Sequence, residues 1–269
     1  QDTLYKRAFY YKNVFDKNVN FVRGRNADGT FQSPFRPDKW GDAFTEGCSW
    51  HWTWCVFHDI KGLQKLMGGK QNFVDKMDSV FTTAPTFDFS YYGQQIHEIT
   101  EMLIMNMGQY AHGNQPIQHM PYLYNYAGQP WKTQKLVRNI MDKLYKNAPD
   151  GLCGDEDNGQ TSAWYVFSAL GFYPVSPGTN EYVLGSPLFK KATLTLENGK
   201  KFVINSPNNS AETVFVQDAK LNAQAYSKNF LTHEAIMKGG ILDLKMSPKP
   251  NENKGVKESD FPFSLSGDK

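Results

Sequence analysis

Cysteine is scarce in this chain of 269 residues, which contains only three. Cys48, Cys55 and Cys153 are an odd number, and no two of them form a CxxC pair. The sequence therefore predicts three free thiols. It excludes a disulfide framework and a cysteine-ligated zinc site.

Charge of one sign and long apolar runs are also missing. The 29 Lys and Arg residues nearly balance 27 Asp and Glu, and the cations are scattered without a basic stripe. This excludes an electrostatic case for nucleic acid or an anionic membrane as partner. No apolar run is long enough to span a bilayer. The N-terminus lacks an initiating Met and a signal peptide, so we expect a processed or truncated piece of a longer protein.

Aromatic and other apolar residues are plentiful. Hydrophobic residues make up 40% of the chain and aromatic ones 14%, including 6 Trp and 14 Tyr. This content is sufficient for a globular core. Aromatic rings also stack on the apolar faces of sugars, and composition alone leaves both interpretations open.

Helical patterns occupy the first part of the chain, and strand patterns follow. Apolar residues recur at helical spacing over 48–67, 96–107, 136–144 and 164–170. After about residue 175, alternating segments over 191–197 and 201–205 flank Asn198-Gly199, which predicts a β-hairpin with a type I′ turn. Further strands are expected over 213–217 and 241–246, before an irregular tail from residue 248. This order favours a mainly α domain followed by a small antiparallel β domain.

Three consecutive acids, Asp155, Glu156 and Asp157, lie in a glycine-rich turn ahead of a helical pattern. Adjacent carboxylates repel one another unless water, a cation or substrate hydroxyls disperse their charge. The turn is interpreted either as a solvated acidic loop or as a functional site.

Another acid, Glu46, precedes a glycine and a segment with three tryptophans, Trp50, Trp52 and Trp54. If indoles surround its carboxyl group, desolvation raises the pKa and suits a general acid. A glutamate near a helix N-terminus interacts instead with free backbone amides, which lowers the pKa. Both interpretations are open at this point.

Several segments in fixed order resemble the C-terminal part of the glycoside hydrolase family 92 α-mannosidases. They are Thr45-Glu-Gly-Cys-Ser-Trp50, His97-Glu98, Gly113-Asn-Gln-Pro-Ile-Gln-His-Met-Pro-Tyr122, Gly154-Asp-Glu-Asp-Asn-Gly-Gln-Thr-Ser-Ala-Trp164, Gly171-Phe-Tyr-Pro174 and Gly185-Ser-Pro-Leu-Phe189. The resemblance covers most of the chain. It implies part of an (α/α)6 helical barrel over residues 1–178, followed by a β-rich region with an irregular tail over 179–269.

The resemblance also implies an activity: exo-acting, inverting hydrolysis of terminal α-linked mannose from glycans with the help of calcium. It assigns Glu46 as the general acid and Asp157, assisted by Asp155, as the general base. Glu98 and Glu101 are the expected calcium ligands. The residues expected to contact substrate are His97, Glu98, Gln115, His119 and Trp50.

Members of this family are longer than this chain. They carry an N-terminal β-sandwich that contributes to the pocket, and we expect the chain to need that region to complete its site. The family's glycan-degrading members are exported, which implies a periplasmic, cell-surface or secreted bacterial enzyme.

Two rival functions are compatible with the same residues. One is a non-catalytic glycan-binding fragment, in which the aromatics stack on sugar and the acids only hold calcium. The other is a different glycosidase with a helical toroid, because that architecture hosts many chemistries. Substituting Glu46 discriminates the binding fragment, since loss of the acid removes hydrolysis and spares binding.

Overall fold

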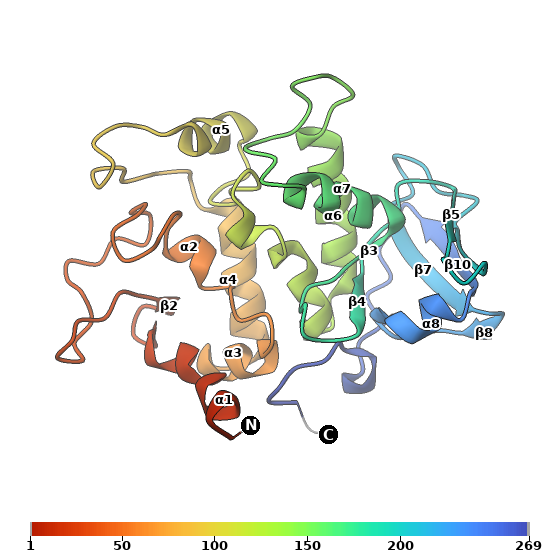
Figure 1. Cartoon of the computed structure of the whole chain (residues 1–269), viewed down its shortest axis with the longest axis horizontal. Coiled ribbons are helices and arrows are strands. Elements are labelled where there is room, and N and C mark those ends of the chain that lie inside the picture. Colours follow the sequence, from red (N-terminus) through yellow and green to blue (C-terminus); the bar gives the residue numbers. More distant parts are fainter. Residues whose placement is uncertain (1, 268–269) are drawn as a thin grey trace. The chain divides into compact units, whose positions relative to one another are not determined.

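The computed structural model describes residues 2–267 (Figure 1). The chain divides into two compact units, each of which is described by itself. The first contains the residues up to Gln118, the short segment Cys153–Asp155 and the segment from Ser264. The second contains His119–Leu152 and Glu156–Phe263. Among the helices of residues 2–267, none has the length and apolarity that a membrane crossing requires.

The first unit is built mainly from helices and long loops. Its elements are α1 (Asp2–Arg7), η1 (Tyr10–Asn13), β1 (Phe15–Asp16), β2 (Phe21–Val22), α2 (Ser49–Trp52), α3 (Ile60–Leu66), α4 (Lys70–Thr82), α5 (His97–Met105) and η2 (Gln115–Ile117). The helix α4 buries Phe73, Val74, Met77 and Val80, which recur at helical spacing on one face. Indole rings complete this core, because Trp40 and Trp54 are fully buried.

A single helix predicted over 48–67 is wrong. The structure has two short helices, α2 and α3, with a turn between them. Asp59 starts the second helix, because its carboxylate accepts a hydrogen bond from the backbone N–H of Gly62. Such an N-cap satisfies a free amide at the start of a helix and favours a break in the preceding chain.

Asp59 also joins distant segments of this unit. Its carboxylate accepts hydrogen bonds from the Tyr11 hydroxyl (2.9 Å), the Ser264 hydroxyl (3.0 Å), and both the hydroxyl (2.7 Å) and the backbone N–H (2.8 Å) of Ser266. Burial raises the pKa of Asp59, but the hydrogen bonds from Ser266, Tyr11 and Ser264 outweigh it and hold the pKa below its ordinary value.

We predict that Asp59→Ala lowers the free energy of unfolding by about 3 kcal/mol, because several buried or partly buried donors lose their charged acceptor. The depressed pKa means that this contribution is complete above the unfolded pKa, about 3.9, and is lost as the pH falls through the folded pKa. Denaturant unfolding from pH 7 to pH 3 should therefore show a difference between wild type and variant that shrinks below about pH 4. Asp75→Ala, on the exposed side of α4, is the control. An Asp59 variant as stable as this control would contradict the prediction.

The second unit combines helices with two sheets. Its elements are η3 (Met120–Ala127), α6 (Pro130–Leu144), α7 (Gln160–Leu170), β3 (Phe172–Tyr173), β4 (Glu181–Leu184), β5 (Lys191–Thr195), β6 (Lys201–Asn205), β7 (Phe215–Leu221), β8 (Gln224–Ala225), β9 (Phe230–Thr232), α8 (His233–Met237), β10 (Gly240–Ser247) and η4 (Glu258–Asp260). One sheet has the order β3-β4-β9, and the other has the order β5-β6-β10-β7-β8.

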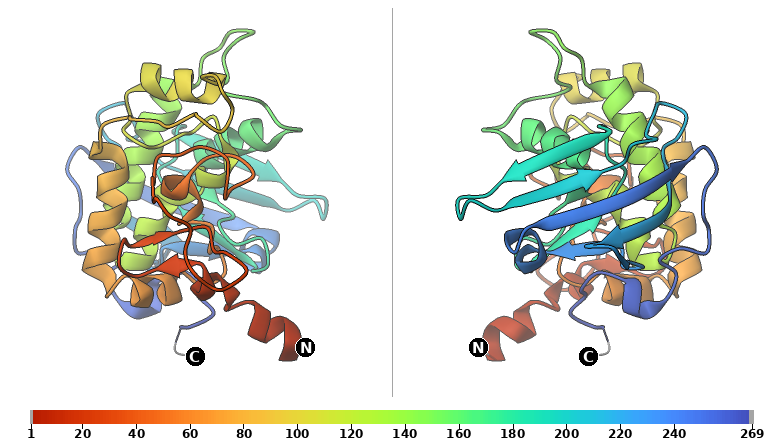
Figure 2. Two further views of the ribbon diagram at one scale, coloured as in Figure 1. Left: turned by 90° about the vertical axis from the view of Figure 1, so that its left-hand side faces the viewer. Right: turned by 90° about the vertical axis from the view of Figure 1, so that its right-hand side faces the viewer.

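The strands of the five-stranded sheet lie side by side in Figure 2. The sheet is mixed. β10 pairs in parallel with β6 and antiparallel with β7. One face packs into a core that includes Phe202, Ile204, Leu242 and Leu244. The helix α6 contacts β7, where the Gln134 side chain accepts a hydrogen bond from the backbone N–H of Val216 (2.9 Å).

Several sequence predictions are confirmed. Helices occur as α5, α6 and α7, the hairpin is β5–β6, strands occur as β7 and β10, and all three cysteines are free. The type I′ turn is wrong, because Gly199 has a positive φ (77°) and Asn198 does not. The expectation of a mainly α chain is also too narrow, because both helices and sheets are extensive. Residues 2–267 do not show a closed helical barrel.

Candidate functional site: a carboxylate cluster at the start of α5

The first turn of α5 brings together residues expected at the site. His97 Nδ1 lies 3.2 Å from Glu101 Oε1, one helical turn further on, and His97 Nε2 lies 3.5 Å from Glu98 Oε1. Asp155 comes from a distant part of the sequence, and its Oδ2 lies 3.6 Å from His97 Nε2. Ligand atoms of His97, Glu98 and Asp155 all lie within 4.8 Å of one another. The structure thus joins four of the predicted residues in the first unit.

Two glycines allow Asp155 to reach this helix. Gly154 has a positive φ (66°), and a Cβ there would lie 2.3 Å from the carbonyl oxygen of Gly113. A Cβ on Gly113 would lie 2.6 Å from Glu101 Oε2. Only residues without side chains permit this close backbone contact. Gln115 adds a hydrogen bond from its side-chain amide to the Asp155 carbonyl oxygen (3.3 Å).

The cluster has unused acceptors. Glu98 Oε2 and Glu101 Oε2 are buried and have no hydrogen-bond partner among the described residues. Buried carboxylate oxygens without partners cost free energy unless a ligand satisfies them. The hydrogen bond to Glu101 raises the pKa of His97, although burial opposes this shift. The negative charges of Glu98 and Asp155 raise the pKa further. The site therefore attracts positive charge or hydrogen-bond donors.

Glu46 lies on a loop just before α2. Its side chain is exposed, so of the two interpretations the structure does not support enclosure of this carboxyl group by three indoles. The Trp52 indole N–H donates a hydrogen bond to the Glu46 carbonyl oxygen. The loop is closed by a hydrogen bond from the Gly41 N–H to the Gly47 carbonyl oxygen (2.9 Å).

Trp50 occupies a different place from the one expected of a ligand contact. Its side chain is only 8% exposed, and its ring packs edge-on against Phe21 at a centroid distance of 4.8 Å. The Lys76 ammonium lies 4.5 Å from the centroid of the Trp50 ring. The half-exposed indole is Trp52, which stacks on Phe44 with an interplanar angle of 12°. Trp52, which the helical spacing did not single out, is therefore the indole of this segment that is accessible to a ligand.

Tyr92 is a further residue that sequence reasoning missed. Burial raises its pKa, and the charges of Glu98 and Glu46 raise it further. The segment before it packs on the Glu46 loop, because the Tyr91 ring occupies the space that a Cβ on Gly41 would fill. A half-buried phenol is thus within electrostatic range of both the carboxylate cluster and the expected general acid. The pair Tyr91-Tyr92 ahead of His97 was the signal available in the sequence.

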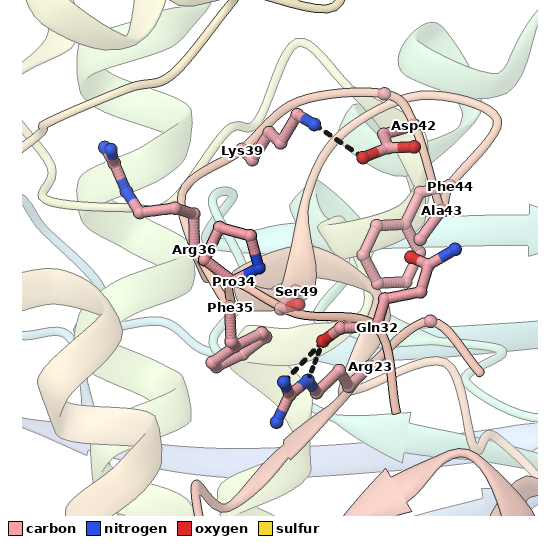
Figure 3. Close-up of a pocket in the computed structure, with 12 residues that line it drawn as sticks. Arg23, Gln32, Pro34, Phe35, Arg36, Lys39, Asp42, Ala43, Phe44 and Ser49 are labelled. Carbon is pink, nitrogen blue, oxygen red and sulfur yellow. Dashed lines mark hydrogen bonds and ion pairs between the residues drawn. The ribbon is translucent and has the colours of Figure 1, made fainter. Parts of the chain in front are cut away.

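A small hollow adjoins the same loop (Figure 3). It has a volume of about 40 Å³, which holds a few water molecules and not a sugar ring. Figure 3 shows Lys39 bound to Asp42 and Arg23 bound to Gln32, whereas Arg36 is turned away from the other labelled side chains. Arg36 pairs with Asp38 (3.0 Å), so the charged side chains that line the hollow are already paired with protein.

The acidic turn itself continues in the second unit. The Glu156 carboxylate caps α7, because it accepts hydrogen bonds from the backbone N–H groups of Gly159 (2.6 Å) and Ser162 (3.4 Å). Hydrogen bonding to Ser162, followed by the bond from Gly159, lowers the pKa of Glu156. Asp157 and Asn158 both have left-handed backbones, with φ of 51° and 56°. This strained conformation is tolerated by Asp and Asn and is common at functional sites.

Asp155 and Asp157 therefore differ from Glu156 in what their carboxylates contact. Glu156 serves the helix, while the Asp155 carboxylate points to the α5 cluster and the Asp157 side chain is exposed. His119 is buried, and its carbonyl oxygen accepts a hydrogen bond from the backbone N–H of Tyr122 (3.0 Å).

Comparison with known proteins decides the family. The model of the glycosyl hydrolase family 92 catalytic domain matches residues 1–248. The chain belongs to glycosyl hydrolase family 92. An inverting mannosidase of family 92 from Bacteroides thetaiotaomicron has a similar structure, with a TM-score of 0.88 and 52% sequence identity, covering 98% of this chain and 36% of that one.

Two further proteins are similar to this chain. An α-mannosidase from the same bacterium, in complex with mannoimidazole, matches with a TM-score of 0.87 and 36% identity over 97% of this chain and 34% of its own. An uncharacterized secreted glycosidase from Arthroderma benhamiae is 25% identical over 98% of this chain and 34% of its own length. The chain thus spans about a third of the length of these relatives.

Proposed function

We propose that this family 92 chain contributes the catalytic carboxylates for hydrolysis of terminal α-linked mannose from glycans, with exo action and inversion at the anomeric carbon. The observation that carries the proposal is the His97–Glu98–Asp155 cluster in a chain of this family. Beside it, Glu98 Oε2 and Glu101 Oε2 are buried without a hydrogen-bond partner among residues 2–267. The related structures described as an inverting mannosidase and as a mannoimidazole complex support the substrate class.

The proposed reaction uses two carboxyl groups, one as a general acid and one as a general base. Inverting hydrolysis requires an acid that protonates the leaving oxygen and a base that deprotonates water on the opposite face, with about 6.5–9.5 Å between them. We assign Glu46 as the acid, and its exposed position on a loop leaves it accessible to a leaving group. We assign Asp157 as the base, with Asp155 assisting. Both belong to the turn whose middle acid is already used by α7.

The remaining contacts orient the sugar. His97, Glu98 and Gln115 surround the position of Asp155, and we propose that they bind hydroxyl groups of the terminal mannose. We also propose His119, in the second unit, as a substrate contact. Trp52 beside Glu46 supplies an apolar ring face for the sugar on the leaving-group side.

The cluster also fits calcium. Hard oxygen donors suit Ca²⁺, and among the described residues Oε2 of Glu98 and Oε2 of Glu101 have no hydrogen-bond partner. We propose that Glu98 and Glu101 hold the ion, while the His97 ring nitrogen is a poor calcium ligand and is left to bind substrate. A bound calcium ion would polarise the sugar hydroxyls and offset the negative charge of the cluster.

We base the proposed architecture and location of the protein on its family. We propose that residues 1–178 form part of an (α/α)6 catalytic barrel and that 179–269 form a C-terminal β-rich region. We also propose, by resemblance to the family, that an N-terminal β-sandwich completes the pocket, and the relatives' greater length is compatible with such a region. The description of the fungal relative as secreted supports an exported enzyme that acts on mannose-containing glycans outside the cell.

We predict that the active enzyme loses α-mannosidase activity with a chelator and regains it with calcium. Glu98→Gln combined with Glu101→Gln should weaken calcium binding at least tenfold in isothermal titration calorimetry, because both carboxylate charges are removed.

Proton NMR during hydrolysis of an aryl α-mannoside should show β-mannose as the first product. Release of α-mannose would disprove inversion, and activity indifferent to a chelator would remove calcium from the mechanism.

A further inference from the structure

An open groove lies on the outer face of the five-stranded sheet, in the second unit. Its volume is about 370 Å³, within the range of about 300–1,000 Å³ that small-molecule sites occupy. The polar side chains that line it are Asn205, Asn208, Asp218, Lys220, Asp243 and Lys245. They come from β6, β10, β7 and the loop after β6.

Strand alternation places these groups on one face. In β10, Leu242 and Leu244 are buried in the core, so Asp243 and Lys245 point to the opposite face. The register pairs Asp243 with Lys220 on one side and with Asn205 on the other. The Asn205 amide donates to Asp243 Oδ1 at 2.8 Å.

The next outward-facing pair along β10 and β7 also joins a lysine and an aspartate. Lys245 is paired in register with Asp218, and the register shifts immediately afterwards, between Lys245 and Met246. A β-bulge of this kind twists the strand and redirects side chains, and bulges are frequent beside binding sites.

The wall of the groove is held from inside the protein. The Asn208 side-chain amide donates to the Met246 carbonyl oxygen (2.6 Å), and its oxygen accepts from the Met246 N–H (3.2 Å). Buried Arg138 of α6 donates to Asn209 Oδ1 (2.8 Å) and to the Ser210 carbonyl oxygen (3.1 Å). The loop is therefore preorganised, which lowers the entropic cost of ordering it when a ligand binds.

The chemistry of the lining selects a neutral, hydroxylated ligand. Two lysines and two aspartates cancel in charge, so the groove does not attract an anion or a cation strongly. Ammonium and amide donors alternate with carboxylate and amide acceptors. Sugar hydroxyls both donate and accept, and thus match such an alternation.

We propose that this groove is a non-catalytic binding site for a neutral oligosaccharide. The choice of mannose as its sugar rests on the proposed function. The site would hold a glycan chain on the β-rich unit by hydrogen bonds to the Lys220–Asp243–Asn205 and Lys245–Asp218 rows. It would raise the local concentration of substrate without taking part in hydrolysis.

The test is NMR titration of the isotopically labelled chain with a neutral α-mannotriose. We expect shifts of the backbone amides of β6, β7 and β10, and a Kd that rises at least tenfold in the double variant Lys220→Ala/Asp243→Ala, because both partners of one row are lost. Glu197→Ala/Lys200→Ala is the matched control, since it removes the same two charges from the exposed hairpin turn of the same sheet. Its Kd should equal that of the wild type.

Three results would contradict the proposal that the groove binds a neutral oligosaccharide. They are shifts confined to other segments, an unchanged Kd in the Lys220/Asp243 variant, and equally tight binding of an anionic oligogalacturonide. Hydrolysis of a small aryl mannoside by the enzyme with its N-terminal region present separates this inference from the proposed function. If that hydrolysis is present and the groove does not bind, the groove alone fails. If hydrolysis is absent and the groove binds the mannotriose, the groove stands and the catalytic proposal fails.

Discussion

Glu46→Gln is expected to lower kcat for an α-linked mannobiose on the order of 10²–10⁴-fold, the usual contribution of a general acid. A glutamine side chain keeps the size of glutamate but cannot protonate the departing oxygen. The loss should be much smaller for a dinitrophenyl mannoside, because its leaving group departs without protonation. Steady-state kinetics of the active enzyme with both substrates is the measurement.

The fold gives a reason to expect a well-folded variant. The Glu46 side chain is exposed, and the loop is held through backbone groups of Gly41, Gly47 and Glu46 itself. Asp42→Asn on the same loop is a suitable control, because its carboxylate is paired with Lys39. Equal losses with both leaving groups would argue against an acid role. Retained binding of mannosides by an inactive Glu46 variant would exclude a purely binding fragment.

Asp157→Asn is expected to cause a comparable loss, on the order of 10²–10⁴-fold in kcat. Asparagine suits the left-handed backbone at this position, so the turn is expected to persist while the base is lost. The defect should be similar for good and poor leaving groups, because water activation is needed for both. Kinetics of the active enzyme with the same pair of substrates measures it.

The neighbouring acid provides a matched control. Glu156→Gln removes a carboxylate that caps α7, so it should lower thermal stability and leave kcat close to that of the wild type. The reverse pattern, with Glu156 essential and Asp157 dispensable, would show that the roles within the acidic turn are assigned incorrectly. Added azide should restore turnover of Asp157→Asn with an activated mannoside, because a small anion needs no base.

Local patterns predicted the elements that periodicity controls. The apolar spacing of α5, α6 and α7 and the alternation of β5 and β6 are properties of neighbouring residues. The pattern of α4 was equally present in Phe73, Val74, Met77 and Val80, but it was not recognised. The break between α2 and α3 was hidden, because Asp59 acts there through partners from both ends of the chain.

By itself, the sequence determined the composition of the site, the order of its motifs and the resemblance to family 92, because these depend on residue identity and spacing. Only the tertiary structure decided that Asp155 joins His97, Glu98 and Glu101, since that meeting depends on the contact between Gly113 and Gly154. It also decided that Trp50 packs in the core while Trp52 lies beside Glu46. Periodicity reports which face of a segment is buried, but contacts between distant segments depend on packing that no local pattern encodes.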